Sequence, residues 1–206
     1  EGGEEHETIG EQSRKQSEGV PRAVPHAPHE ESKPSRNTPR PDGEDRIVFL
    51  MFGALRKEKG IREVIHAFRQ LSPGAAKNAT LWLFGQVSAD LEDEFPDLVE
   101  LLRRERPNLH VQVETRFLPE RELHEALQGA DVVLAPYLRS EGSSGVIGHS
   151  ARYRVPVLGP KSGLVGSLID EHDLGITVEA NDPKAIVRAV HKYIKGELSR
   201  CETPGM

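Results

Sequence analysis

The sequence predicts an α/β fold, a Rossmann-like parallel sheet with helices on both faces, and three observations support this prediction. Short apolar runs of strand length recur along the chain from residue 47 onward. The segments between these runs carry apolar residues at three- and four-residue steps, which is the period of an amphipathic helix. Apolar strands that alternate with such helices are typical of a parallel sheet covered on both faces, with right-handed crossovers. Because ligands bind at the carboxyl ends of the strands in such sheets, the residues directly after each strand are candidate site residues.

The predicted strands are apolar runs with few polar interruptions, as expected for strands buried on both faces. We expect Trp82, in the middle of one run, to lie in the core. The runs are Ile47–Phe52, Thr80–Phe84, Leu109–Val113, Val132–Ala135, Val155–Leu158 and Ile176–Val178.

The predicted helices follow from helical periodicity and from start and stop signals. The second of them ends before Pro107, and the last begins at the cap Asp182 with Pro183 in the first helical position. The apolar positions that define these helices are Ile61, Val64, Ile65, Phe68 and Leu71; Phe95, Leu98, Val99, Leu101 and Leu102; Leu123, Ala126 and Leu127; and Ile186, Val187, Val190 and Ile194.

A shift in composition predicts the domain organisation. Residues 1–46 contain no Leu, Met, Phe, Tyr, Trp or Cys and hold six of the fifteen prolines, so they cannot bury enough apolar surface to offset the entropy of ordering. We interpret them as a disordered or loosely ordered Pro-rich linker, or as the end of a missing N-terminal domain. Residues 47–195 are expected to form the Rossmann-like domain, and residues 196–206, which have little apolar content, to fray.

The overall composition excludes several classes of protein. The net charge of −6, from 27 Lys and Arg against 33 Asp and Glu, argues against a nucleic-acid-binding protein. The single cysteine, Cys201, cannot form an internal disulfide, and no stretch of roughly 18 apolar residues could span a bilayer. We therefore expect a cytoplasmic protein. Peripheral contact of Arg103, Arg104 and Arg106 with anionic lipid is the alternative to a charged helix end, which is the better-supported interpretation.

The loop after the first predicted strand, residues 53–60, brackets three cations between two glycines and precedes a helix. Arg56, Lys57 and Lys59 could hold an anion together with the N-terminus of that helix, although an ordinary solvated turn would have the same composition. The chain contains neither a G-x-G-x-x-G fingerprint in this loop nor a G-x-x-x-x-G-K-[ST] motif, so neither a dinucleotide site nor a P-loop is supported.

Two later loops also follow predicted strands. Residues 137–149 contain a run of small residues, Gly142–Gly145, that lets the backbone approach a ligand closely. Ser143 or Ser144 can cap the next helix, whose free N–H groups then form a seat for a diphosphate. The loop Gly159–Leu164, with Lys161, is a weaker candidate for the same kind of contact.

Several motifs occur in an order that resembles the donor domain of glycosyltransferase family 4. The motifs are Gly53, Lys59-Gly60, Leu83-Phe84-Gly85, Asp131–Pro136, Glu141-Gly142, Val155-Pro156-Val157 and Leu174-Gly175. The resemblance covers roughly residues 46–195 and implies the C-terminal half of a GT-B fold. Val24-Pro25-His26 is similar to the end of the family's acceptor-binding domain, which implies that an N-terminal acceptor domain is missing from this chain.

The resemblance implies roles for particular residues. Lys59 matches a lysine that grips the donor diphosphate, while the preceding arginine position is Ala54 here and Arg56 could substitute for it. Glu141 matches a glutamate that contacts the transferred sugar, and His149 stands where a second glutamate holds the ribose. Gly166 replaces a further glutamate. The implied catalytic residues are Lys59, Arg56 and Glu141, and the implied donor-binding residues are Gly53, Lys59, Glu141, Gly142, Ser143, Ser144, Gly145, Val146 and His149.

The expected function is transfer of a sugar from a UDP- or GDP-sugar to an unknown acceptor, with retention as the resemblance implies, and without a metal or a tightly bound cofactor. Cations and helix N–H groups would stabilise the charge that grows on the departing nucleoside diphosphate. Without its acceptor domain the chain is expected to bind donor but not to turn it over. A degenerate, non-enzymatic module of the same fold is the alternative, supported by Ala54, His149 and Gly166, and a sugar epimerase is a third possibility. The base, the sugar, the acceptor and the oligomeric state are not identified by the sequence.

Overall fold

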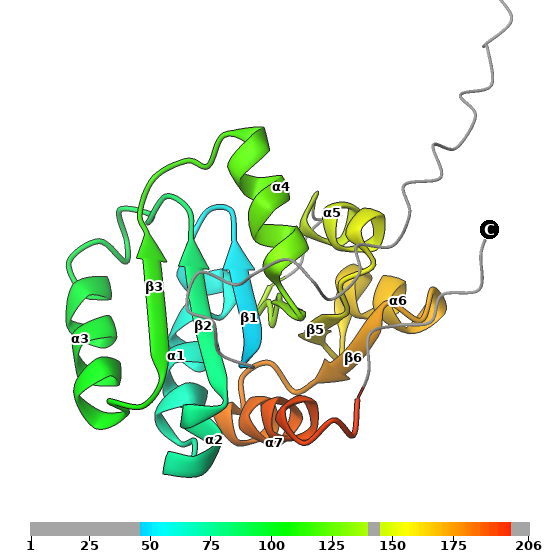
Figure 1. Ribbon diagram of the computed structural model, residues 1–206. Helices are drawn as coiled ribbons and strands as arrows, with labels where there is room; N and C mark the ends of the chain where they lie inside the picture. Colours follow the sequence, from blue (N-terminus) through cyan, green and yellow to red (C-terminus); the bar gives the residue numbers. More distant parts are fainter. Residues whose placement is uncertain (1–45, 140–144, 199–206) are drawn as a thin grey trace, which may run out of the picture. The chain divides into compact units, whose positions relative to one another are not determined.

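The computed structural model describes residues 46–139 and 145–198, and these form a parallel six-stranded sheet between two layers of helices (Figure 1). The strand order is β3-β2-β1-β4-β5-β6, so the order reverses between β1 and β4. Each strand overlaps a predicted run, and no end differs from the prediction by more than two residues. The bounds are β1 Ile47–Phe52, β2 Ala79–Phe84, β3 His110–Glu114, β4 Val132–Leu134, β5 Val157–Pro160 and β6 Gly175–Val178.

Helices connect the strands, and those that sequence periodicity predicts are present. Asp182 caps the last helix, because its side chain accepts a hydrogen bond of 2.9 Å from the Lys184 N–H and Pro183 opens the helix, as predicted. The helix before Pro107 ends at Glu105. The bounds are α1 Ile61–Arg69, α2 Pro73–Lys77, α3 Phe95–Glu105, α4 Glu120–Gly129, α5 Gly145–Tyr153, α6 Gly163–Glu171 and α7 Pro183–Ile194, with a short 3₁₀ helix, η1, at Lys57–Lys59.

Several elements differ from the sequence-based expectation. The structure contains α2 and α6, which no periodic pattern predicted, and part of the expected loop 159–164 is strand and helix instead. Gly159 and Pro160 continue β5, and α6 begins at Gly163. The two glycines within α6 lower its intrinsic helix propensity, so tertiary packing of its apolar face is what stabilises it.

The core has two parts because side chains alternate across the strands. Phe49 and Met51 of β1 point to the face covered by α1, α2, α3 and α7, whereas Val48, Leu50 and Phe52 point to the face covered by α4, α5 and α6 (Figure 1). Trp82 is only half buried, at the margin of this second face, where its ring stacks on Phe84 at 5.4 Å. The expectation that Trp82 lies in the core is thus wrong in part.

Two arginines at the end of α3 donate hydrogen bonds to backbone carbonyls of neighbouring segments. Arg103 donates to the Val111 carbonyl at 3.1 Å, and Arg106 donates to the Leu71 carbonyl at 2.7 Å. These contacts favour the interpretation of a charged helix end. Within the described ranges, no helix has the length and apolar character needed to cross a membrane.

Candidate functional site

The candidate site lies where the strand order reverses, at the carboxyl ends of β1 and β4. The loop after β1 and the segment after β4 are joined there, because the Leu138 and Arg139 N–H groups both donate to the Glu58 carbonyl, at 2.8 and 3.3 Å. Gly60 packs directly against the same segment: a Cβ at this position would lie 2.2 Å from the Pro136 carbonyl oxygen. The two loops therefore form one surface at the point where open α/β sheets bind ligands.

Lys59 is the half-buried cation of this surface. Its Nζ lies 5.3 Å from the centroid of the Tyr137 ring, which is 7% exposed, so the ammonium makes a cation–π contact. Burial, and then the nearby charge of Arg56, hold the pKa of Lys59 below its ordinary value of 10.5. Within residues 46–139 and 145–198, no carboxylate forms an ion pair with Lys59. A desolvated ammonium in this position is suited to binding an anion.

The other two cations of the loop have different surroundings. Arg56 is exposed and precedes η1 in an extended conformation. Lys57 lies 3.9 Å from a carboxylate oxygen of Glu94, at the start of α3. Gly53, the first residue after β1, has a φ of +90°, and a Cβ on it would lie 3.7 Å from the Lys59 ammonium. The structure thus brings Gly53, Arg56 and Lys59 together at one edge and gives Lys57 an acidic partner away from Lys59.

Helix α5 presents the second group of predicted residues. Gly145 begins the helix, while Val146 is buried in the second part of the core, so only the backbone of Val146 is available to a ligand. The His149 ring packs edge-on against Phe52, the last residue of β1, with ring centroids 6.2 Å apart. This contact places His149 over the carboxyl end of β1. Glu141, Gly142, Ser143 and Ser144 lie outside the described residues.

Gly166, where the family resemblance places a glutamate, has no room for a side chain. It is buried in α6, where a Cβ would lie 2.4 Å from the Pro160 carbonyl oxygen. A glutamate could not occupy this position without movement of β5 or α6. Lys161, the cation of the third predicted loop, lies 3.7 Å from Glu179 in an exposed pair.

Sequence reasoning missed the residues that support Lys59. Tyr137 was part of a predicted loop, but its contact with Lys59 depends on the pairing of β1 with β4, for which the sequence carries no local signal. The same holds for the Glu58 carbonyl and for Phe52 beneath His149. A large aromatic residue directly after a strand-ending proline is the one signal that could have drawn attention to Tyr137.

Acidic and histidine side chains form no metal centre in the described part of the chain, where no group of three or more ligands is suitably arranged. Glu94 is the N-cap residue of α3 and pairs with Arg62.

Two surface hollows lie away from the candidate site. They have volumes of about 380 and 690 Å³, and residues that line them, such as Asn108 and Asn78, precede β3 and β2. Both hollows are therefore near the amino-terminal edge of the sheet, and we give more weight to the carboxyl edge, where the loops and cations converge.

Comparison with known proteins identifies relatives of this domain. The family model described as glycosyl transferases group 1 matches residues 34–204. A search of curated proteins finds no significant match. The C-terminal domain of the group 1 glycosyl transferase LpcC from Francisella tularensis is similar in structure, with a TM-score of 0.63 and 18% identity over 72% of this chain and 75% of that chain.

Two longer proteins share the fold. Alr3699/HepE from Anabaena, in complex with UDP and glucose, has a TM-score of 0.61 and 20% identity over 74% of this chain and 40% of that chain. WaaG, a glycosyltransferase involved in lipopolysaccharide biosynthesis, has a TM-score of 0.59 and 21% identity over 74% of this chain and 39% of that chain. The chain thus corresponds to about two fifths of these neighbours.

Proposed function

The chain belongs to the glycosyl transferases of group 1, and from this premise we propose that it binds a nucleotide-diphosphate sugar and serves in transfer of the sugar with retention. The observation that carries the proposal is Lys59, a half-buried ammonium with a lowered pKa and no carboxylate partner in the described residues. It stands at the switch point of a parallel sheet, where a diphosphate would supply the missing negative charge.

The proposed chemistry is stabilisation of the leaving group. Negative charge grows on the nucleoside diphosphate as its bond to the sugar breaks, and cations that are already in position stabilise this charge without reorganisation. Lys59 and Arg56 would supply the side-chain charges, and Gly53 would leave room for the ligand. The N–H groups of Gly145 and Val146 at the start of α5 would add backbone donors, together with those of Ser143 and Ser144, which precede the helix in the sequence.

Roles for the remaining residues follow the family resemblance. Glu141 would accept hydrogen bonds from hydroxyls of the transferred sugar, and the small residues from Gly142 to Gly145 would let the backbone approach the phosphates. His149 would contact the ribose, and its place over the carboxyl end of β1 supports this role. A neutral imidazole offers one acceptor where a carboxylate offers several, so this contact would be weaker than the family's.

A UDP-sugar is the first donor to test, and a GDP-sugar the second. The structurally similar HepE is in complex with UDP and glucose, which supports uridine. We further propose that a second domain binds the acceptor, since the longer neighbours contain more than twice the length matched here. The chain alone would then bind donor without transferring its sugar, whereas addition of that domain would restore transfer.

A non-catalytic nucleotide-binding or interaction module is the second candidate. The observation that favours it is the absence of two family side chains, at Ala54 and Gly166, the latter in a position with no space for a carboxylate. This module would bind its ligand without sugar transfer even in the presence of the acceptor domain.

Calorimetric titration with UDP, GDP, ADP and their sugars tests the proposal. We expect one diphosphate to bind with micromolar to millimolar affinity, and Lys59→Ala to weaken binding by about 1.5–3 kcal/mol because a charge-assisted phosphate contact is lost. Lys77→Ala, in α2 near the opposite edge, is the matched control and should leave the affinity unchanged. Absence of binding by every nucleotide to the folded protein would refute the donor-domain proposal.

A further inference from the structure

We propose that Glu94 is a positioning residue of the donor site, whose carboxylate clamps the end of the loop after β1 and so fixes the placement of Lys59. This inference rests on the proposed function, because that loop is the one that would hold the diphosphate. Glu94 itself would not touch the ligand.

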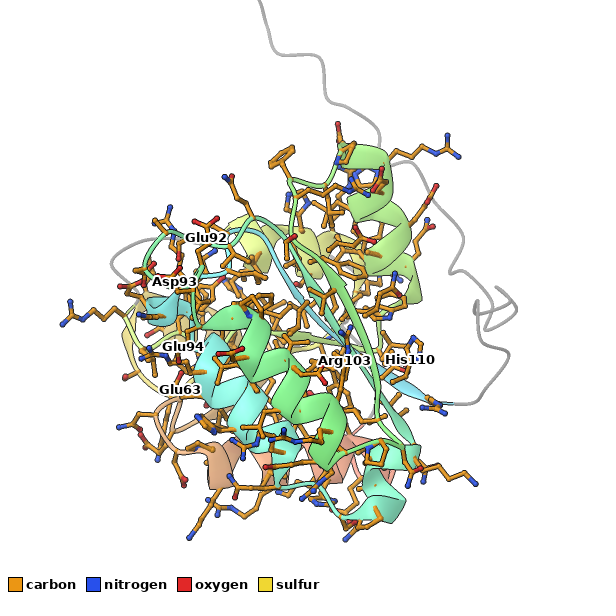
Figure 2. The ribbon with its side chains drawn as sticks, turned by 90° about the vertical axis from the view of Figure 1, so that its left-hand side faces the viewer. Glu63, Glu92, Asp93, Glu94, Arg103 and His110 are labelled. Atoms are coloured by element: carbon orange, nitrogen blue, oxygen red, sulfur yellow. The ribbon has the colours of Figure 1, made fainter. Side chains whose placement is uncertain are left out.

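The contacts of Glu94 enclose the part of the loop that carries Lys59. Its Oε2 accepts a hydrogen bond from the Arg62 guanidinium, in the first turn of α1, and lies 3.9 Å from the Lys57 ammonium in η1. Lys59 and Gly60 lie between these two partners in the sequence. Figure 2 shows Glu94 beside α1, with Glu92 and Asp93 above it. One carboxylate at the start of α3 therefore holds both η1 and α1.

The beginning of the same loop is fixed by backbone contacts. Leu55, which is fully buried, donates its N–H to the Gln86 carbonyl at 2.9 Å. The Ser88 N–H and hydroxyl both donate to the Leu55 carbonyl, at 3.0 and 3.1 Å. With one end held by residues 86–88 and the other by Glu94, the loop is tied to the segment between β2 and α3 along its length.

Glu94 also separates the charges of the loop. The hydrogen bond from Arg62 holds the pKa of Glu94 below its ordinary value, so the carboxylate is ionised at neutral pH. It draws the Lys57 ammonium toward α3, whereas the Lys59 ammonium lies against Tyr137 after β4. Without Glu94, Lys57 would lose its ion-pair partner, although the charge of Asp90 would remain nearby, and the end of η1 would lose its link to α3.

The protein contains a matched pair that serves as a control. Arg69, in the last turn of α1, donates two hydrogen bonds of 2.8 Å to Glu105, in the last turn of α3. The two pairs join the same two helices at opposite ends, and both are partly exposed to solvent. Ion pairs with such exposure contribute little to global stability. If removal of the two pairs affects ligand binding differently, the difference therefore arises from the loop after β1 and not from a loss of overall stability.

The experiment compares Glu94→Gln with Glu105→Gln. We measure the affinity for UDP, with GDP and ADP in parallel, the unfolding temperature, and amide hydrogen exchange in residues 53–60. Glu94→Gln should weaken nucleotide binding about three- to tenfold and speed exchange in this loop, since a displaced charge binds less well. Glu105→Gln should change the unfolding temperature by a similar amount and leave affinity and loop exchange unaltered.

Reversal of all three charges restores both contacts and supplies a rescue. The triple variant Glu94→Arg, Arg62→Glu and Lys57→Glu re-forms the contacts with α1 and η1 in opposite polarity and should recover slow exchange in the loop, whereas Glu94→Arg alone should not. If the wild-type protein binds nucleotide and Glu94→Gln binds it as tightly, with unchanged exchange, the positioning role is overturned. If the wild type binds no nucleotide at all, the proposed function fails, whereas the exchange data still decide whether Glu94 holds the loop.

Discussion

At Lys59, burial opposes the charge that the proposed site requires. Removal from water disfavours the ammonium, and the positive charge of Arg56 disfavours it further. The Tyr137 ring offsets part of this cost through its negative face, but it carries no net charge. If the proposed function holds, a bound diphosphate would supply a counter-charge for Lys59 and so offset the remaining cost of its burial.

This environment predicts a pH dependence of nucleotide affinity. A diphosphate favours protonated Lys59, so affinity should fall as the pH rises through the pKa of Lys59 in the free protein, which lies below 10.5. The contribution of Lys59 to the free energy of unfolding should instead rise with pH over this window. The reason is that Lys59 binds its proton more tightly in the unfolded chain than in the folded protein.

The measurement is calorimetric titration of UDP at several pH values, for the wild type and for Lys59→Arg. Arginine keeps its charge over the whole window, and comparison at each pH cancels the ionisation of the ligand itself. An equal decline in affinity for both proteins would show that Lys59 does not hold the diphosphate.

The close packing around Gly166 predicts that a side chain at this position lowers the stability of the protein. Gly166→Ala should destabilise the protein by about 1–3 kcal/mol, because the new Cβ would lie 2.4 Å from the Pro160 carbonyl oxygen. Gly148→Ala, also within a helix, has open space around the new Cβ and should be neutral or should stabilise by about 0.5–1 kcal/mol. Urea unfolding measures both, and equal free energies of unfolding for the two variants would contradict the steric argument.

Among the secondary-structure elements, the predictable ones are those with a strong local pattern. The strand at residues 47–52 is an unbroken apolar run, and α1 repeats its apolar residues with a helical period, so both could be placed from the sequence. Helix α6 could not, because Gly163 and Gly166 conceal its periodicity and its stability depends on packing against β5 and β6. Trp82 was misplaced since apolar character alone does not distinguish the centre of a sheet face from its margin.

The N-cap of α7 supplies a prediction at this scale. Asp182→Ala should lower the free energy of unfolding by about 1 kcal/mol, because the Lys184 N–H loses its acceptor. Asp182→Asn, which retains an acceptor oxygen, should lose much less. Ser162, the N-cap residue of α6, accepts no capping hydrogen bond from its helix, so Ser162→Ala is a control that should unfold like the wild type. Chemical denaturation measures the free energy of unfolding of the three variants. A loss in Ser162→Ala as large as that in Asp182→Ala would contradict the capping explanation.

The candidate site was predictable in part. The motif order and the rule that ligands bind at strand carboxyl ends were enough to select Gly53, Arg56, Lys59 and His149, and the structure brings these residues to one edge. The partners of Lys59 and Lys57 were not predictable, because Tyr137 and Glu94 reach the loop only through the pairing of strands and the packing of helices. Such contacts between distant parts of the sequence leave no pattern in either segment.

On the scale of the whole molecule, contacts at both ends of the β1–β4 strand pair join parts of the domain that are distant in the sequence. Asp131, just before β4, accepts a hydrogen bond of 2.9 Å from the Val48 N–H, 83 residues earlier, and Leu138 bonds to Glu58 at the other end of the same strand pair. Closing so long a loop is entropically costly, which makes such contacts slow to form. The two loops of the site therefore come together only when β4 docks on β1. A ligand that binds both loops has no surface to recognise before this step, so it would slow the unfolding of the domain without hastening its folding.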